Sequence, residues 1–363
     1  MRKFLGTSLL TLASFGFALV AAEVVLRWTG IVPGRGGVVT VTSTEFEQIP
    51  GIFSPNQDTV ENQIPQLRYR VHINNLGYRG ENFSSSKSDG EFRILFVGDS
   101  GVFGDFVGDR DSLPAQTERA LDSRCNGLLR VINAGLGGST ITEHTKIVER
   151  SLSLNPDLVI LQFSENDVRD LAGAAMWDEL ARNRRAKSTF PLSLAYPYLR
   201  DTALWHLALR AVATIHERRV TAKVSEDQQD EGDTARPETQ AVGRDKRAET
   251  DQYRLQYQER LIDLRTSLNA NGIPMIMTVM PSHHSVYGHG ESDQLDWLGR
   301  LTRELKIDTV SFLPVYRDDG RDETELYLLP YDGHTSPAGY QIAAQQLAER
   351  LITYELLSEH CSN

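Results

Sequence analysis

The chain has few cysteines and fewer basic than acidic residues, and each shortage excludes a class of protein. Its 363 residues include two cysteines, too few for a disulfide-dense scaffold or a cysteine-based zinc framework. Lysine and arginine total 38 against 49 for aspartate and glutamate, so the formal net charge is −11. Because nucleic-acid binding relies on cations that neutralise phosphates, this balance argues against a nucleic-acid-binding protein. The hydrophobic share of 40% is typical of a folded protein with a sizeable core.

One internal stretch lacks the residues that build a core. Residues 221–252 contain no Leu, Ile or aromatic residue and are rich in charged residues and glutamine. Such a segment buries too little apolar surface to offset the entropy lost on ordering. We predict disorder at 221–252, within an insertion at 171–252. Its earlier part holds helical pieces that form either a lid beside the functional site or an insert packed for its own stability.

The first 29 residues lack charge over a long run. Arg2 and Lys3 precede an uncharged segment from Phe4 to Ala22, which as a helix reaches about 29 Å, near the thickness of a bilayer core. Basic residues in front of such a run keep the N-terminus inside and export the rest. We predict that residues 1–29 form an N-terminal transmembrane helix or a cleaved signal segment. A buried core helix is the remaining alternative.

Short apolar runs alternate with helical patterns after residue 91. Residues 30–90 are turn-rich and polar, and we interpret them as a linker and a wrap-around arm. Apolar runs typical of buried strands follow at 93–97, 129–134, 157–163, 273–279 and 308–312. Helical patterns lie at 113–121, 141–152, 253–268 and 336–357. This alternation predicts an α/β domain at 91–363, with a five-stranded parallel sheet covered by helices on both faces.

Four polar segments either follow a predicted strand or precede the helix after one. Ser100 follows the first strand on a tight turn, which exposes its hydroxyl as a nucleophile requires. The glycines at 135–138 follow the second strand, and Asn166 follows the third, where its amide can donate to a developing oxyanion. His334 precedes the last helix, with Asp332 two residues earlier. Because the carboxyl ends of parallel strands meet at the ligand-binding edge of the sheet, we expect one common site.

In order and content, these segments resemble the conserved blocks of the SGNH (GDSL-type) hydrolase superfamily, over about residues 93–351 without the insertion. Residues 75–80 resemble the arm of its exported, membrane-anchored bacterial members. The resemblance implies a three-layer α/β/α flavodoxin-like fold and a triad of Ser100 as nucleophile, His334 as base and Asp332 as its orienting acid. It implies an oxyanion hole formed by Ser100, Gly138 and Asn166. No cofactor and no metal are expected.

Two positions depart from the family pattern. Ser164 stands where the family often has glycine, and Tyr331 stands where the acid is common, three residues before the histidine. Asp332 is spaced as in the subgroup that resembles periplasmic polysaccharide O-acetyltransferases. This spacing favours O-acyl (acetyl) esters of carbohydrate or cell-envelope polymers as substrates.

We therefore expect an exported serine ester hydrolase or O-acyltransferase, anchored in the membrane with its catalytic domain in the periplasm. A transferase would need a membrane partner that supplies the acyl donor. The alternative is a catalytically inactive SGNH-like carbohydrate-binding module in a cell-envelope polysaccharide system. A dinucleotide-binding loop is disfavoured, because the third glycine of that pattern would fall at Thr140.

His283 and His284 follow the fourth predicted strand. They are either substrate-contacting residues at the rim of the site or ordinary loop residues, and their spacing does not fit a metal site.

The two cysteines each follow a helix that borders the sheet. In a sheet of order 2-1-3-4-5, the first and last helices cover the same face and run the same way. Cys125 follows the first and Cys361 the last, so we expect them near each other, at the end opposite the site. They are either a disulfide or free thiols.

Overall fold

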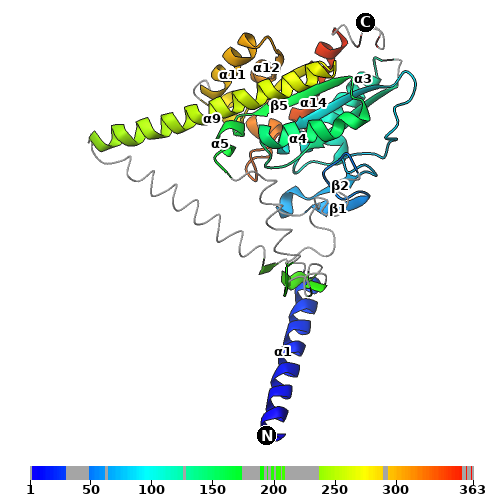
Figure 1. Cartoon of the computed structure of the whole chain (residues 1–363), viewed down its shortest axis with the longest axis vertical. Coiled ribbons are helices and arrows are strands. Elements are labelled where there is room, and N and C mark those ends of the chain that lie inside the picture. The colour runs from blue at the N-terminus through cyan, green and yellow to red at the C-terminus, as the bar shows by residue number, and fades with distance from the viewer. Residues whose placement is uncertain are drawn as a thin grey trace. The chain divides into compact units, whose positions relative to one another are not determined.

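The computed structural model describes residues 2–29, 49–61, 64–125, 128–173, 189–191, 194, 198–199, 202–205, 207–208, 237–288, 293–353, 357 and 361. The chain divides into two compact units (Figure 1). One comprises Met1–Gly37 and Ala181–Lys246, and the other comprises Val38–Leu180 and Arg247–Asn363.

Five parallel strands form the centre of the second unit. They are β3 (Phe92–Gly98), β4 (Leu129–Gly135), β5 (Leu158–Ser164), β6 (Met275–Met280) and β7 (Asp308–Ser311). Their order is β4-β3-β5-β6-β7, which is 2-1-3-4-5 when the predicted strands are numbered along the chain. Every residue of β3 is buried, as expected for a strand with both faces covered. The predicted five-stranded parallel sheet is confirmed.

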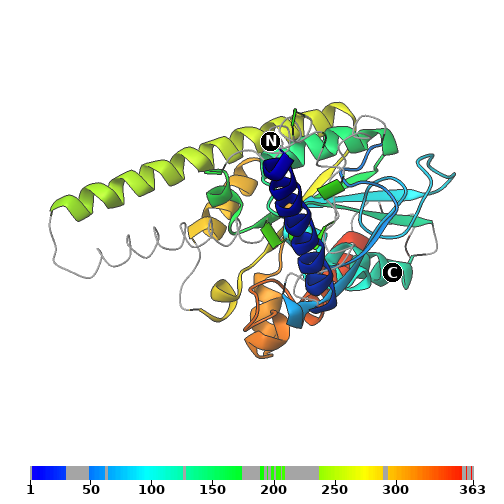
Figure 2. The ribbon, with the colours of Figure 1, turned by 90° about the horizontal axis from the view of Figure 1, so that it is seen from below.

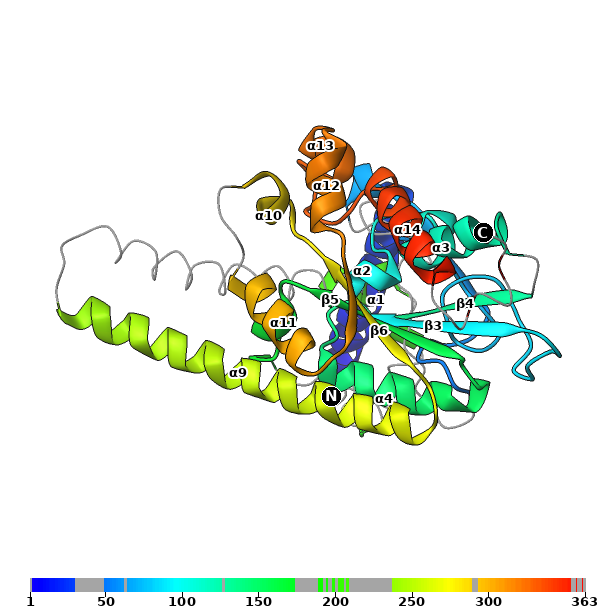
Figure 3. The same ribbon diagram turned by 90° about the horizontal axis from the view of Figure 1, so that it is seen from above.

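Helices cover both faces of this sheet (Figure 3). One face packs against α4 (Ile141–Ser151), α9 (Pro237–Ala270) and α11 (Asp293–Glu304). The other packs against α3 (Leu113–Asp122), α12 (Leu313–Asp319) and α14 (Pro337–Ile352). Side chains alternate along β3, so that Leu95 joins the first core and Phe96 the second. The predicted three-layer α/β/α fold is confirmed.

Short helices and turns connect these elements. The α-helical ones are α2 (Ser100–Phe103), α5 (Asp167–Asp170), α10 (His283–Tyr287) and α13 (Glu323–Leu326). The 3-10 turns are η1 (Pro65–Leu67), η2 (Asp109–Asp111) and η3 (Leu152–Leu154).

The segment that precedes the sheet contains an antiparallel hairpin. Its strands are β1 (Gln57–Glu61) and β2 (Tyr69–Ile73). Beyond β2, Arg79 forms isolated bridges with Ile73 and with Asn133 of β4, so this segment reaches the edge strand of the sheet. Residues 30–48, the first part of the predicted linker and arm at 30–90, lie outside the described residues. Below, "the arm" means residues 49–83.

In the first unit, α1 (Arg2–Thr29) is one continuous helix (Figure 2). The carboxylate of Glu23 accepts the backbone N–H groups of Ala203 and Leu204 at 2.9 and 3.0 Å. Within the described residues, no helix contains a stretch long and apolar enough to cross a bilayer. The structure thus supports the helix predicted at 1–29 but gives no support to its membrane-spanning role.

Helix α9 begins inside the stretch predicted to be disordered. Residues 237–252 are helical, whereas residues 221–236 lie outside the described residues. The second half of α9 buries Tyr257, Leu261, Leu264 and Leu268. A helix nucleated by such burial extends through alanine, glutamate, glutamine, lysine and arginine at little cost. The helix at 237–252 differs from the disorder expected there, since extending an existing helix does not require further apolar burial.

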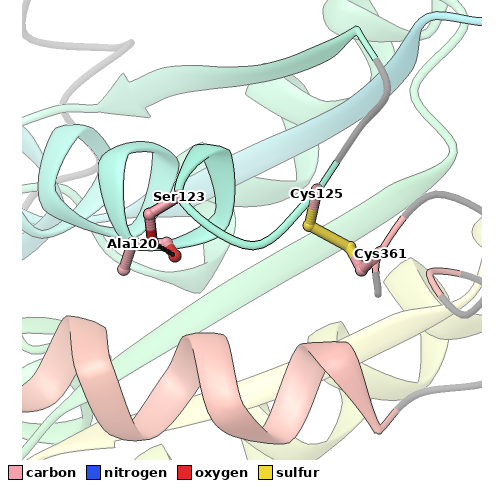
Figure 4. The surroundings of a disulfide bond; sticks show 4 residues. All are labelled: Ala120, Ser123, Cys125 and Cys361. Atoms are coloured by element: carbon pink, nitrogen blue, oxygen red, sulfur yellow. Dashed lines mark hydrogen bonds between the residues drawn. A yellow bond between two sulfur atoms is a disulfide. The ribbon is translucent and has the colours of Figure 1, made fainter. Parts of the chain in front are cut away.

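Cys125 and Cys361 form a disulfide (Figure 4). Cys125 lies just beyond the end of α3, Cys361 lies beyond α14, and the two helices pack against each other. The predicted proximity is confirmed, and of the two alternatives the structure has the disulfide.

Candidate active site

Ser100 is the first residue of α2, on the tight turn that follows β3. Asp99 is the N-cap of α2, and its carboxylate accepts the Gly101 N–H at 2.9 Å. The end of β4 passes so close that a Cβ on Gly135 would lie 2.1 Å from the backbone N of Phe103. This turn places Ser100 at the carboxyl edge of the sheet.

The structure brings the three predicted triad residues together. The Nε2 of His334 lies 2.8 Å from the Oγ of Ser100, although the two residues are 234 positions apart in sequence. The Nδ1 of His334 is hydrogen-bonded to Oδ1 of Asp332, which also accepts the His334 backbone N–H at 2.8 Å. Because a carboxylate only accepts hydrogen bonds, Nδ1 carries the proton and Nε2 faces the serine hydroxyl. This is the arrangement of a nucleophile, a base and an orienting acid.

The charges around His334 favour its protonated form. Burial alone would lower the pKa of His334, but the hydrogen bond and charge of Asp332 raise it above its ordinary value, aided by the charges of Asp105 and Asp99. Burial alone would raise the pKa of Asp332, but its bond to His334 and the histidine charge hold it below its ordinary value. The opposite shifts favour the imidazolium that forms when the base takes a proton.

The predicted oxyanion donors come from the two neighbouring strand ends. Gly138 lies in the turn after β4 with a φ of 70°, and a Cβ on the preceding Gly137 would lie 4.0 Å from the Cβ of Ser100. Asn166 follows β5, and its Nδ2 donates to Oδ2 of Asp170 at 2.7 Å. The Asn166 side chain is also hydrogen-bonded to the carboxylate of Asp99. The oxyanion role of Gly138 and Asn166 stays a prediction.

Ser164 has a partner that explains its departure from the family pattern. Its hydroxyl donates to Oδ1 of Asp99 at 3.1 Å. Asp99 is buried, and burial raises the pKa of its carboxyl against the opposing hydrogen bonds from Gly101, Ser164 and Asn166. The Ser164 hydroxyl thus stabilises the carboxylate beside the nucleophile, which a glycine cannot do.

His283 and His284 lie at the start of α10, beside the triad loop. The Cδ2 of His283 is 3.7 Å from the position of a Cβ on Gly333, between Asp332 and His334. The two histidine rings stack with centroids 3.9 Å apart, and His284 is exposed. This position agrees with a rim, and contact with substrate stays a prediction.

Several residues near the triad were not found by sequence analysis. Phe106 contacts the ring of His334, with centroids 5.4 Å apart. Oδ1 of Asp105 accepts the hydroxyl of Tyr69, from the arm, at 3.3 Å. Glu165 accepts the Ser282 N–H at 2.7 Å. The only available signal was closeness in sequence to Ser100 and Asn166.

Comparison with known proteins gives a family and remote structural relatives, two of which are described here. The model of the GDSL-like Lipase/Acylhydrolase family matches residues 96–342. No curated protein matches. A catalytic mutant of an acetylxylan esterase from Geobacillus stearothermophilus is 16% identical, over 73% of this chain and 95% of that one, with a TM-score of 0.41. A two-domain esterase active on acetylated mannans is 18% identical, over 72% of this chain and 50% of that one, with a TM-score of 0.38. At these identities and TM-scores, neither structure bears on the substrate.

The family match covers more than half of the chain and contains Ser100, Asp332 and His334. The chain therefore belongs to the GDSL-like lipase/acylhydrolase family and is a hydrolase of ester bonds.

Proposed function

We propose that this protein is an exported serine esterase that acts on O-acyl esters, above all acetyl esters, of carbohydrate or cell-envelope polymers. The proposal is carried by one observation: the Oγ of Ser100 lies 2.8 Å from the Nε2 of His334, whose Nδ1 is bonded to Asp332. These groups can generate an alkoxide at neutral pH and return its proton to a leaving alcohol.

Acylation begins when the Nε2 of His334 takes the proton of the Ser100 hydroxyl. The Oγ forms a bond to the ester carbonyl carbon, and the carbonyl oxygen takes the negative charge. The carbon then loses its bond to the alcohol oxygen, which receives the proton from Nε2. Asp332 holds the imidazole and stabilises its positive charge throughout.

Deacylation repeats these steps with water as the nucleophile. His334 takes a proton from water, the hydroxide oxygen bonds to the acyl carbon, and Ser100 leaves with the proton returned to its Oγ. A sugar hydroxyl in place of water would give acyl transfer with the same residues.

In both steps, the negatively charged carbonyl oxygen accepts hydrogen bonds. The donors are the backbone N–H groups of Ser100 and Gly138 and the side-chain amide of Asn166. Losing one such donor typically costs about 3 kcal/mol in the barrier, or about 10²-fold in rate.

Three features support the substrate and the compartment. The spacing of Asp332 and His334 resembles that of periplasmic polysaccharide O-acetyltransferases. The uncharged run that follows Arg2 and Lys3 is typical of an export signal or an anchor. A structural disulfide between Cys125 and Cys361 is typical of oxidising compartments outside the cytoplasm.

The test compares the purified parent with Ser100→Ala. We expect the parent to hydrolyse p-nitrophenyl acetate, to release acetate from acetylated polysaccharide and to be labelled at Ser100 by a fluorophosphonate. Ser100→Ala should lose at least about 10³-fold in kcat with an unchanged melting temperature. If the variant hydrolyses as fast as the parent, Ser100 is not the nucleophile. If the parent is neither labelled nor active, the binding module is the better interpretation.

A further inference from the structure

The loop that follows α2 carries a residue in an unusual backbone conformation. Phe106 has a φ of 64°, a region that bulky side chains rarely occupy. Such a conformation persists only where the surrounding structure imposes it, and it occurs most often at functional sites. The ring of Phe106 meets the ring of His334 edge-on, at an interplanar angle of 64°.

Arg79 of the arm is hydrogen-bonded to the backbone of this loop. The Arg79 side chain is 1% exposed. Its Nη1 donates to the carbonyls of Phe103 and Gly104 at 2.6 Å each, and its Nη2 donates to the carbonyl of Val107 at 2.7 Å. One guanidinium therefore holds carbonyl groups on both sides of Phe106.

Arg79 is itself held in place by the arm and by η2. Its Nε donates to Oδ1 of Asp109 at 2.9 Å, and the same carboxylate accepts the backbone N–H of His72. Its guanidinium carbon lies 4.8 Å from the centre of the Phe103 ring. A planar group with several fixed donors is suited to such a role, and a lysine ammonium is not.

We propose that Arg79 and Phe106 are positioning residues of the active site: Arg79 imposes the conformation of residues 103–107, and this loop holds Phe106 against His334 so that Nε2 stays directed at Ser100. This inference rests on the proposed function, because it assigns the means by which His334 is held. It also makes the arm a part of the active site.

The contact with Phe106 restricts a motion of His334 that the hydrogen bond to Asp332 allows. That bond leaves the imidazole free to tilt about the line through Nδ1. A ring packed edge-on against the imidazole restricts the tilt. Misplacing a catalytic group by about 1 Å can cost up to about 10²-fold in rate.

The chain offers a matched control in a second buried arginine. The Arg93 side chain is also 1% exposed, and it donates to the carbonyls of Ser84, Ser85, Ser86 and Leu154. It lies in β3 near the start of the strand, whereas Ser100 follows its end. Arg93→Lys therefore breaks a comparable set of hydrogen bonds away from the triad.

The experiment measures kcat, KM and melting temperature of the full chain with p-nitrophenyl acetate. Arg79→Lys and Phe106→Ala are expected to lower kcat roughly 10- to 100-fold with KM within about twofold. Fluorophosphonate labelling of Ser100 should slow by the same factor. Phe106→Tyr keeps the ring and is expected to recover most of the lost kcat. Arg93→Lys should lower the melting temperature by a similar amount to Arg79→Lys. Unlike Arg79→Lys, it should keep the kcat of the parent.

Two results would overturn the proposal. One is parental kcat in Phe106→Ala, and the other is an equal loss of kcat in Arg93→Lys and Arg79→Lys. Should Arg79→Lys fail to fold, the comparison of Phe106→Ala with Phe106→Tyr decides. The Ser100→Ala variant distinguishes failure of this proposal from failure of the proposed function. If Ser100→Ala is active, the serine mechanism of the proposed function is wrong. If Ser100→Ala is inactive and Phe106→Ala has the kcat of the parent, the serine mechanism holds but the positioning role of Phe106 is wrong.

Discussion

Three carboxylates act on His334 in different ways. Asp332 is bonded to Nδ1, whereas Asp105 and Asp99 act through charge alone, and together they raise the pKa of the imidazole against the effect of burial. A general base takes a proton only in its neutral form. A raised pKa therefore moves the acid limit of activity to higher pH.

The first prediction concerns this limit. The kcat/KM of the parent for p-nitrophenyl acetate should fall on the acid side with a midpoint above 6.5, the ordinary pKa of histidine. Asp332→Asn removes the charge that raises this pKa and the acceptor for Nδ1–H. Its kcat should fall by about 10⁴-fold, and the midpoint of its remaining activity should move to lower pH. The measurement is a pH profile of both proteins across the titration range of histidine. A parental midpoint below 6.5 would contradict the electrostatics described here.

Sequence reasoning could find the triad residues but not those that position them. Ser100 follows a strand, and Asp332 and His334 precede the helix after another strand. Both positions fall at the edge where the carboxyl ends of parallel strands meet. Phe106 contacts His334 from a loop to which Arg79 of the arm donates hydrogen bonds. No pattern of residue types indicates a positive φ at a phenylalanine or the path of an arm.

At the scale of elements, Glu165 ties the end of β5 to α10. Its Oε1 accepts the Ser282 N–H at 2.7 Å, and its Oε2 accepts the Ser285 hydroxyl at 2.8 Å. Ser282 is the N-cap of α10, the helix that carries His283 and His284. The loop of Asn166 and the predicted rim are thus joined through one carboxylate.

Removing this carboxylate should loosen α10. Glu165→Ala is expected to lower the free energy of unfolding by roughly 1–3 kcal/mol, because it leaves the Ser282 N–H without its acceptor. Urea denaturation of the purified protein measures the change. Glu323→Ala is the control, since Glu323 meets His283 at 3.8 Å from an exposed position and should contribute at most about 1 kcal/mol. Equal losses of unfolding free energy in Glu165→Ala and Glu323→Ala would contradict the proposed role of Glu165 in holding α10.

The strands could be predicted from sequence more closely than the helices. Short, mainly apolar runs located the five strands to within a few residues. The start of α9 was missed because 237–252 was judged by burial rather than by continuation of a helix. Helix α11 was not predicted, although Leu298 and Leu301 are buried at helical spacing and gave a usable signal. The five-residue α10 is too short for any periodic pattern to show.

At the scale of the whole molecule, the disulfide connects the first part of the α/β unit to its last. Cys125 and Cys361 are 236 positions apart, with α3 and α14 packed together on the face that they share. The strand order could be predicted from the family resemblance, and the proximity of the two cysteines followed from that order, whereas the bond between them did not. The division into two compact units could not be predicted, because no sequence pattern indicates that α1 contacts residues of the insertion.

Breaking this bond should cost stability and not activity. Cys361→Ser is expected to lower the free energy of unfolding by roughly 2–5 kcal/mol, since the bond closes a long loop in the unfolded chain. Ser123→Ala is the control, because the exposed Ser123 hydroxyl donates to the nearby carbonyl of Ala120 (Figure 4) and should change stability by about 0.5 kcal/mol at most. Denaturant-induced unfolding in the absence of a reductant measures the change in unfolding free energy of both variants. A parental kcat in Cys361→Ser at low temperature is also expected, and a large loss would place the disulfide closer to the chemistry than the structure does.

The same bond determines how a cut molecule would behave. A protease that cleaves one peptide bond anywhere between Cys125 and Cys361, including within the long insertion, yields two pieces still tied through sulfur. Such a clipped protein would migrate as a single band on a denaturing gel and separate into two only after a reductant is added.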